Sequence, residues 1–286
     1  MTYDTKDGYV LLYGGVNKTG YLNDTWKFSA GTWALLHPKI TPPKSLGAMT
    51  YDAKDGYVVL LVVNQTWKFS GGVWTQLVPD RSPPVRYASA MTYDAKDGYV
   101  LLFGGYASSG SSGYLGDTWR FVGGQWTNIT TSAHPKARAF SVMTYDTKDG
   151  YVVLFGGCDV GSPCSTGGFL SDTWKFVDGK WTKLTISAHP SARGGMAMTY
   201  DVADGYVVLF GGCDTTNCSH PYSDTWKFVG GSWTHLTSLT HPGPRLFASM
   251  TFDTKDGQVV LFGGSGPSFK YLGDTWKYLA GSWTKV

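Results

Sequence analysis

Hydrophobic and polar positions follow the same order six times along the chain. Each copy opens with Met-Thr-Tyr-Asp or Met-Thr-Phe-Asp, and then has a polar turn with Asp-Gly and a run of Val and Leu residues. Most copies continue with Phe-Gly-Gly, then Thr-Trp-Lys/Arg-Phe/Tyr and a second Trp. The copies begin 42 to 55 residues apart, at Met1, Met49, Met91, Met143, Met198 and Met250. Self-similarity at this period is typical of solenoids, propellers and arrays.

The fourth copy predicts four antiparallel strands, A to D. Residues 143–146 form strand A, and residues 151–155 are nearly all apolar, as in a strand B that is buried on both faces. Residues 172–176 alternate as strand C. Asp178-Gly179 is typical of a two-residue type I′ hairpin that leads into strand D.

The chain has 12 Trp residues, two in each copy and seven residues apart. A two-residue hairpin places Phe176 opposite Trp181, with Trp174 on the same face, and cross-strand aromatic pairs stabilise a sheet. We expect these residues to form the core between neighbouring sheets. An exposed platform that stacks on carbohydrate is the alternative for one or two of them.

Four strands in each of six copies predict an all-β, six-bladed β-propeller with one antiparallel blade per repeat. No change of composition or linker divides the chain, so we expect one domain over residues 1–286. The predicted blades cover residues 1–40, 41–82, 83–134, 135–189, 190–241 and 242–286. The first copy lacks the lead-in that precedes strand A in the later copies, so the chain is either part of a longer precursor or starts there.

The order Phe-Gly-Gly, Asp-Thr-Trp and a later Trp resembles the kelch repeat over essentially the whole chain. The resemblance implies a six- or seven-bladed propeller from a family that mostly binds proteins and includes a minority of enzymes. Two features depart from the family pattern. The C–D turn is short, and the second copy reads Leu-Leu-Val-Val-Asn-Gln-Thr-Trp at 60–67, without Gly-Gly and with Gln65 in place of Asp.

Charge and hydropathy exclude two classes of partner. The net charge is +3 and no basic cluster occurs, so we expect no nucleic-acid partner. No apolar run approaches the roughly 18 residues of a membrane span. All acidic residues are Asp, so an enzyme of this sequence would need Asp or His as its general base.

Strand direction sorts the connections onto two rims of the propeller. The A–B and C–D turns share one rim and are short and uniform, whereas the B–C loops and D–A crossovers share the other and differ in every copy. Ligand sites usually lie on variable loops held by a rigid frame. We therefore expect any binding site on the rim of the B–C and D–A loops.

All four cysteines lie in two consecutive B–C loops: Cys158 with Cys164, and Cys213 with Cys218. Four cysteines allow three pairings, and we expect the local pairing within each loop. A metal site that uses Cys213, Cys218 and His220 is the alternative, although its spacing matches no strong zinc pattern. Disulfides favour an extracellular or cell-surface location.

Every asparagine of the chain opens an Asn-x-Ser/Thr acceptor. The five are Asn17, Asn23, Asn64, Asn128 and Asn217. The pattern predicts N-glycosylation of an exported protein. The alternative is coincidence, since the repeat itself supplies two of the required Thr residues.

A cation lies five residues before each later Met-Thr: Lys44, Arg86, Arg138, Arg193 and Arg245. We expect this basic ring near the mouth of the central channel, where it could bind carboxylates or acidic sugars. The alternative, which we favour, is a latch with the Asp before Thr-Trp, because an unpaired and partly buried Arg is costly. In the second copy Gln65 would weaken that latch.

No catalytic residue, metal or cofactor emerges from the repeat pattern. We therefore expect a non-catalytic extracellular or cell-surface module that recognises protein or glycan through the B–C/D–A rim. A structural glycoprotein subunit of a surface layer or filament, which self-associates, is the first alternative. A carbohydrate-active enzyme on a kelch frame is the second.

Overall fold

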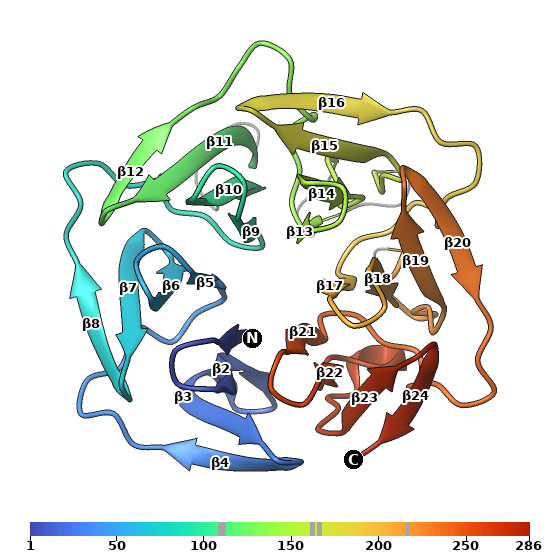
Figure 1. Ribbon diagram of the computed structural model, residues 1–286, viewed down its shortest axis with the longest axis horizontal. Coiled ribbons are helices and arrows are strands. Elements are labelled where there is room, and N and C mark those ends of the chain that lie inside the picture. Colours follow the sequence, from blue (N-terminus) through green and yellow to red (C-terminus); the bar gives the residue numbers. More distant parts are fainter. Residues whose placement is uncertain (108–112, 161–163, 165–167, 216–217) are drawn as a thin grey trace.

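The computed structural model shows six four-stranded antiparallel sheets arranged as blades around a central channel (Figure 1). The structure describes residues 1–286 except 108–112, 161–163, 165–167 and 216–217. Each blade follows chain order from its inner to its outer strand. The predicted fold, an all-β six-bladed propeller with one blade per repeat, is confirmed.

Blades 1 to 3 cover the first half of the chain. Blade 1 has β1 Thr2–Asp4, β2 Tyr9–Asn17, β3 Gly20–Ser29 and β4 Thr32–Leu36. Blade 2 has β5 Gly47–Asp52, β6 Tyr57–Val62, β7 Gln65–Ser70 and β8 Val73–Leu77. Blade 3 has β9 Ala90–Asp94, β10 Tyr99–Tyr106, β11 Tyr114–Val122 and β12 Gln125–Asn128.

Blades 4 to 6 complete the ring. Blade 4 has β13 Val142–Asp146, β14 Tyr151–Phe155, β15 Thr173–Val177 and β16 Lys180–Leu184. Blade 5 has β17 Ala197–Asp201, β18 Tyr206–Phe210, β19 Thr225–Val229 and β20 Ser232–Leu236. Blade 6 has β21 Ser249–Asp253, β22 Gln258–Phe262, β23 Thr275–Leu279 and β24 Ser282–Lys285, and a 3-10 turn, η1, spans Pro267–Phe269.

The short C–D hairpins fix the register of the outer strands. In blade 4 Asp178 and Gly179 both have positive φ, as a type I′ turn requires. Phe176 therefore pairs with Trp181, and their ring centroids lie 5.0 Å apart. The cross-strand aromatic pair that the sequence predicted is present.

The hydrophobic core lies between neighbouring blades. Strand β14 is buried on both faces, as its apolar run predicts, and Trp181 of blade 4 packs 5.2 Å from Phe103 of blade 3. Of the 12 Trp side chains, eight are buried and four are partly buried, namely Trp26, Trp33, Trp174 and Trp226. The Trp residues therefore form core rather than a platform that faces solvent.

A hydrogen bond joins each blade to the one before it. The indole of the second Trp donates to a Thr hydroxyl on strand C of the preceding blade, at 2.8–3.0 Å. The six pairs are Trp33–Thr275, Trp74–Thr25, Trp126–Thr66, Trp181–Thr118, Trp233–Thr173 and Trp283–Thr225. The first pair joins blade 1 to blade 6 and closes the ring.

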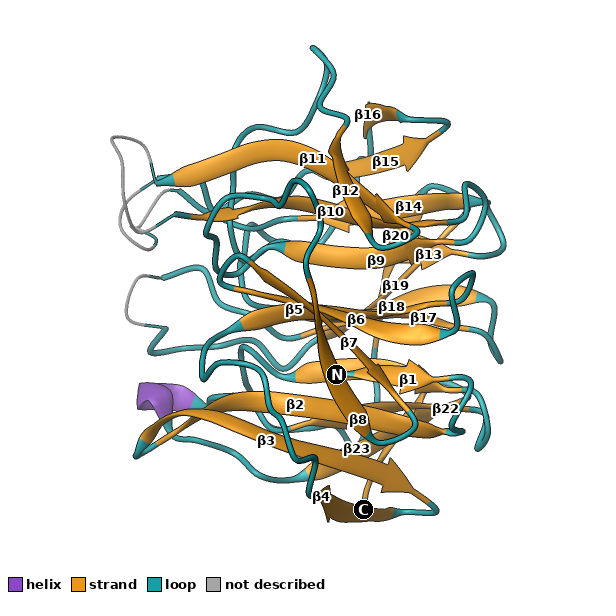
Figure 2. Ribbon diagram, turned by 90° about the vertical axis from the view of Figure 1, so that its left-hand side faces the viewer, coloured by secondary structure: helices purple, strands orange, loops and turns teal. Residues whose placement is uncertain are grey.

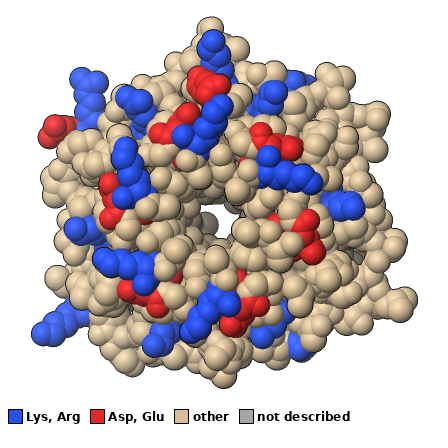
Figure 3. Space-filling view, viewed as in Figure 1, with Lys and Arg blue, Asp and Glu red and all other residues tan. Residues whose placement is uncertain are grey.

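The two rims differ in the length of their connections: Figure 2 shows long loops on one side of the propeller and short turns on the other. We call the side of the A–B and C–D turns the turn rim and the side of the B–C loops and D–A crossovers the loop rim. Figure 3 views the turn rim, where Lys, Arg and Asp side chains lie interspersed around the opening of the channel. Within the described residues, no helix has the length and apolar character needed to cross a bilayer.

Candidate functional site

Four of the five predicted cations lie buried in pairs on the loop rim. The guanidinium groups of Arg86, Arg138, Arg193 and Arg245 contact Asp117, Asp172, Asp224 and Asp274 through both nitrogens, at 2.5–3.0 Å. Each Arg side chain is only 1–2% exposed. Each Nη1 also donates to the carbonyl of the first Gly of Gly-Gly. This geometry agrees with the latch interpretation.

Each latch connects two blades. The backbone N–H of Arg138 donates to the carbonyl of Leu115 in blade 3, and its carbonyl accepts from the N–H of Gly105 in the same blade. Its side chain reaches forward to Asp172 of blade 4. The other three arginines repeat this bridge, Arg86 with only the first of the two backbone bonds. The latch therefore joins two blades: the backbone of the Arg bonds to the preceding blade, and its side chain bonds to the following blade.

The ion pairs set the protonation of their carboxylates. Hydrogen bonds from Arg245 lower the pKa of Asp274 to about 2. Burial acts in the opposite direction at Asp117 and Asp172, but the bonds from Arg86 and Arg138 prevail, and the pKa of each stays below its usual value. All four arginines are engaged in this way.

The fifth cation does not follow the pattern. Lys44 is exposed and makes no ion pair among the described residues, and Gln65 replaces the partner Asp in its blade. Gln65 instead accepts the indole hydrogen of Trp67 at 3.1 Å. The crossover before blade 2 is therefore not latched as the later four are.

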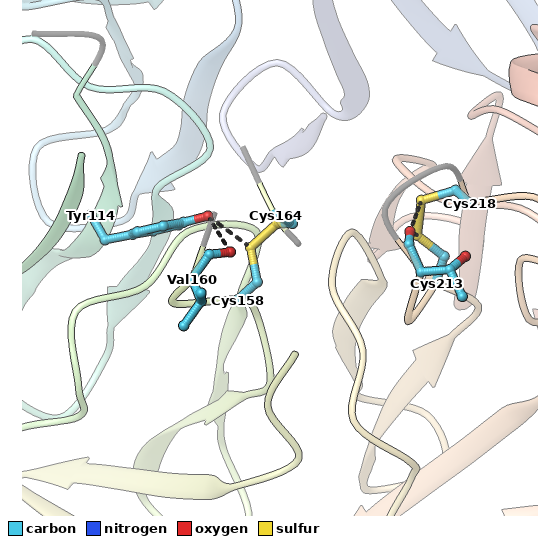
Figure 4. The surroundings of a disulfide bond; sticks show 7 residues. Tyr114, Cys158, Val160, Cys164, Cys213 and Cys218 are labelled. Atoms are coloured by element: carbon cyan, nitrogen blue, oxygen red, sulfur yellow. Dashed lines mark hydrogen bonds between the residues drawn. A yellow bond between two sulfur atoms is a disulfide. The ribbon is translucent and has the colours of Figure 1, made fainter. Parts of the chain in front are cut away.

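Two disulfides stand in adjacent loops of the loop rim, Cys158–Cys164 and Cys213–Cys218 (Figure 4). This is the local pairing expected from the sequence. The hydroxyl of Tyr114, from blade 3, lies 3.4 Å from both Cys158 Sγ and the carbonyl of Val160. With both thiols of the second loop bonded to each other, the alternative metal site has lost two ligands. No cluster of three metal-ligating side chains occurs in the described part of the chain.

A ladder of left-handed residues runs around the mouth of the channel. Ala88, Phe140, Gly195 and Phe247 each lie two residues after a latch Arg and have φ of 52° to 70°. Each of the last three donates its N–H to the carbonyl of the preceding member, at 2.7–3.0 Å. Phenylalanine seldom adopts this conformation, and such strain is typical of functional positions.

The ladder brings two aromatic rings together. The rings of Phe140 and Phe247 lie with centroids 5.4 Å apart, tilted by 42° to each other, and the two residues flank Gly195 in the ladder. A Cβ on Gly195 would lie 2.7 Å from the Phe247 ring, so this contact requires glycine between the two. Phe247 nevertheless remains 49% exposed.

These rings form the wall of an apolar pocket of about 130 Å³. Its lining is Phe140, Cys164, Phe169, Gly194, Cys213, Thr215, Cys218, Phe247 and Phe269. Both disulfides contribute to the wall, and Phe269, also in the left-handed region, is 46% exposed. We call this site the aromatic pocket.

Sequence reasoning did not identify the aromatic pocket. It expected cations that bind an anionic ligand or pair with Asp, and in the structure the four Arg side chains pair with Asp, while the residue two positions after each Arg belongs to the ladder. The position holds Ala88, Phe140, Gly195 and Phe247 in successive copies. An alignment of the copies at that position would have shown two large aromatic residues where the repeat requires none.

The predicted glycosylation sites differ in accessibility. Asn64 and Asn128 are exposed, whereas Asn17 and Asn23 are partly covered and bond to Thr19 and Thr41. Asn217 lies outside the described residues. Glycosylation stays a prediction at all five.

The turn rim offers a different kind of surface. An open cleft of about 530 Å³ is lined there by charged residues that include Lys54, Arg120, Asp97 and Asp178. Asp178 also forms an exposed ion pair with Lys96. Exposed ion pairs of this kind contribute little free energy.

A family model decides which proteins this chain is related to. The model of the KLHDC2/KLHL20/DRC7 Kelch-repeats domain matches residues 47–264. The chain belongs to the kelch-repeat family. Kelch propellers are typically protein-binding modules. No curated protein matches the chain.

Proposed function

We propose that this kelch propeller is a non-catalytic extracellular or cell-surface module that binds a partner protein through its loop rim. The aromatic pocket accepts an apolar side chain of the partner. The variable B–C loops and crossovers around the pocket supply the remaining contacts.

The aromatic pocket is the observation that carries this proposal. Its volume of about 130 Å³ suits one large aliphatic or aromatic side chain, and its wall consists mostly of Phe rings and disulfides. Buried pockets that receive a single apolar anchor dominate the energy of many protein interfaces. Phe247 and Phe269 remain about half exposed although both are large and apolar, which favours a surface that a partner covers.

The disulfides support the extracellular part of the proposal. Two local disulfides persist in oxidising compartments and are rare in reducing ones. The exposed acceptors at Asn64 and Asn128 agree with passage through a secretory route.

A pair of charge substitutions on opposite rims tests the proposal. A partner is first isolated with the unmodified protein and identified, and its affinity is then measured for two variants. Phe247→Asp places a charge in the aromatic pocket, while Val202→Asp does the same to a side chain that is 56% exposed on the turn rim. We expect Phe247→Asp to weaken binding by roughly tenfold or more, as for a central anchor, and Val202→Asp to change it less than about twofold.

Two outcomes would contradict the proposal. One is equal binding by both variants, and the other is a loss confined to Val202→Asp. A glycan array offers a further check, because strong sugar binding that survives Phe247→Asp would replace the protein partner with a carbohydrate. Thermal melting of both variants confirms that each remains folded.

A further inference from the structure

Asp-Gly occurs seven times in the chain, and one of the seven stands in a different kind of turn. Six follow strand A, in the A–B turns, whereas Asp178-Gly179 forms the C–D hairpin between β15 and β16 of blade 4. The C–D hairpins of the other blades have Ala-Gly or Gly-Gly at this place. Asp-Gly is a chemically reactive sequence, because glycine has no side chain that shields its own amide nitrogen from the neighbouring carboxyl group.

The A–B turns restrain both reactive groups of their Asp-Gly. In each turn the amide of the glycine donates to the carbonyl of the strand A Asp, at 2.8–2.9 Å. The six donors are Gly8, Gly56, Gly98, Gly150, Gly205 and Gly257. In five turns a Tyr hydroxyl also donates to the carboxylate of the Asp-Gly, at 2.8–3.1 Å. The sixth carboxylate, that of Asp256, lacks this bond because Gln258 replaces the Tyr.

Asp178-Gly179 has neither restraint. The amide of Gly179 donates no hydrogen bond to any residue that the structure describes. The Asp178 side chain is 69% exposed, and its only contact partner of opposite charge among the described residues is Lys96, which is itself exposed. An exposed ion pair holds a side chain weakly. Both Asp178 and Gly179 line the open cleft of the turn rim, where water reaches them.

We infer that Asp178-Gly179 is a site of spontaneous isoaspartate formation. The amide nitrogen of Gly179 attacks Cγ of the protonated Asp178 carboxyl group. A C–N bond forms, the amide hydrogen and the carboxyl OH leave as water, and a cyclic imide results. Water then opens the imide at one of its two carbonyls. Cleavage of the bond between nitrogen and Cγ restores Asp, whereas cleavage at the main-chain carbonyl leaves isoaspartate, and no oxidant or reductant is consumed.

The product alters a turn that the core of the propeller depends on. In isoaspartate the main chain runs through the side-chain carbon atoms, which adds a methylene group to the backbone of a two-residue hairpin. This hairpin sets Phe176 opposite Trp181, and Trp181 packs against the preceding blade. The register of an aromatic pair in the core therefore depends on the chemical integrity of one exposed turn.

Ageing of the folded protein tests the inference site by site. The full chain is incubated at neutral pH below its melting temperature and digested, and electron-transfer fragmentation of the peptides distinguishes isoaspartate from Asp. We expect isoaspartate to form at Asp178 roughly tenfold or more faster than at Asp55, where two hydrogen bonds must open first. Asp256, with one such bond, should react at an intermediate rate. The same chain unfolded in denaturant is the control, and all seven sites should react there at similar rates.

A conservative variant tests the protective hydrogen bond. Tyr57→Phe removes the hydroxyl that donates to Asp55 at 3.1 Å and leaves the turn at Asp178 as it is. Isoaspartate formation at Asp55 should rise severalfold, to the rate seen at Asp256, while the rate at Asp178 stays unchanged. Thermal melting confirms that the variant is folded during the incubation.

Three results would overturn the inference. They are equal rates at all seven sites of the folded protein, isoaspartate that appears first in an A–B turn, and an unmodified Asp178 after the unfolded control has reacted. The measurements on the unmodified chain decide the matter even where Tyr57→Phe fails to fold. None of them involves a binding partner, so the inference stands or falls independently of the proposed function.

Discussion

Each blade beyond the second has an aspartate that ends strand A at the turn rim and another that precedes Thr-Trp of strand C at the loop rim, and the surroundings of these two are opposite. In blade 3, Asp117 on the loop rim receives two bonds from Arg86, and its pKa lies below the usual value. On the turn rim, the Asp94 side chain accepts the backbone N–H groups of Lys96 and Asp97 in its own turn, and burial raises its pKa to about 6. One residue type thus fastens blades together on one rim and shapes a hairpin on the other.

The comparison explains why the two rims vary so differently between copies. An Asp that bonds the N–H groups two and three residues ahead completes a local turn, so the turn rim needs only a short, constant motif. An Asp that pairs with a distant Arg holds a crossover in place and leaves the loop beside it free to change. The loop rim therefore combines a fixed frame with variable loops, which is the usual setting of a binding site.

The largest expected effect comes from removing a latch. Arg138→Ala leaves Asp172 charged and mostly buried, at 15% exposure, and should reduce the free energy of unfolding by about 3–5 kcal/mol. Lys44→Ala removes the unlatched cation and should change it by less than about 0.5 kcal/mol. Denaturant unfolding of both variants measures the difference. Equal effects would show that the buried pairs do not hold the loop rim.

Two glycines in blade 5, one on each rim, have the same φ and allow the packing of the two rims to be compared. Gly205 on the turn rim and Gly211 on the loop rim both have φ of +71°. A Cβ on Gly211 would lie 2.4 Å from the Arg245 carbonyl, while one on Gly205 would meet only the Tyr200 hydroxyl at 4.0 Å.

Alanine at either glycine should cost about 1–2 kcal/mol through its left-handed backbone. Gly211→Ala should cost about 1–3 kcal/mol more, because the crossover must move. Thermal or denaturant unfolding gives both values. A Gly205→Ala variant as unstable as Gly211→Ala would mean that the crossover packs less tightly than the structure shows.

The two rims should respond to pH in opposite directions. Asp94 and Asp201 have folded pKa values of about 6, above the unfolded value, so their contribution to stability is complete below pH 4 and is lost as pH rises through 6. Asp274, with a pKa of about 2, contributes fully above pH 4, and its contribution is lost as pH falls through 2.

The free energy of unfolding should decrease between pH 4 and pH 7, and Asp201→Asn should make this decrease smaller by about 2–3 kcal/mol. Asp274→Asn should leave that interval unchanged and should destabilise the protein above pH 4. Unfolding titrations at several pH values measure both effects. An Asp201→Asn variant that keeps the full pH dependence would place the responsible group elsewhere.

The smallest expected effect comes from one disulfide. Replacing Cys213 and Cys218 by Ser opens a link of sequence separation 5 and should cost about 2 kcal/mol, because the entropy of closing so short a loop is modest. Binding of the partner should fall further than this loss explains, since both cysteines line the aromatic pocket. Unchanged binding would remove the disulfides from the proposed interface.

Repeated features could be predicted from the sequence and unrepeated ones could not. A Trp equivalent to Trp181 and a two-residue turn that ends in Gly, as at Asp178-Gly179, recur in each copy, so periodicity and turn chemistry predicted the strands, their register and the two rims. The latch partners followed from two fixed places in the repeat: Arg138 lies five residues before Met143, and Asp172 directly precedes Thr173-Trp174. The direction of the latch, from one blade to the next, depends on backbone pairing between copies and left no mark in the local pattern.

The aromatic pocket escaped prediction for a physical reason. Phe140 and Phe247 are 107 residues apart in the sequence. They meet only because the ladder curves around the channel and Gly195 leaves space between them. Their left-handed backbone is imposed by neighbouring blades rather than by their own propensity, which opposes it. A contact of this kind can be recognised only when the blades are placed together in the closed ring.

Hydrogen exchange of the propeller with and without its isolated partner tests most directly whether the loop rim is the binding face. The account predicts protection on binding in residues 138–142, 193–197 and 245–249, which carry the ladder and the aromatic pocket, with no change in the A–B turn at 202–205. Protection of the A–B turns with an unchanged ladder would contradict it.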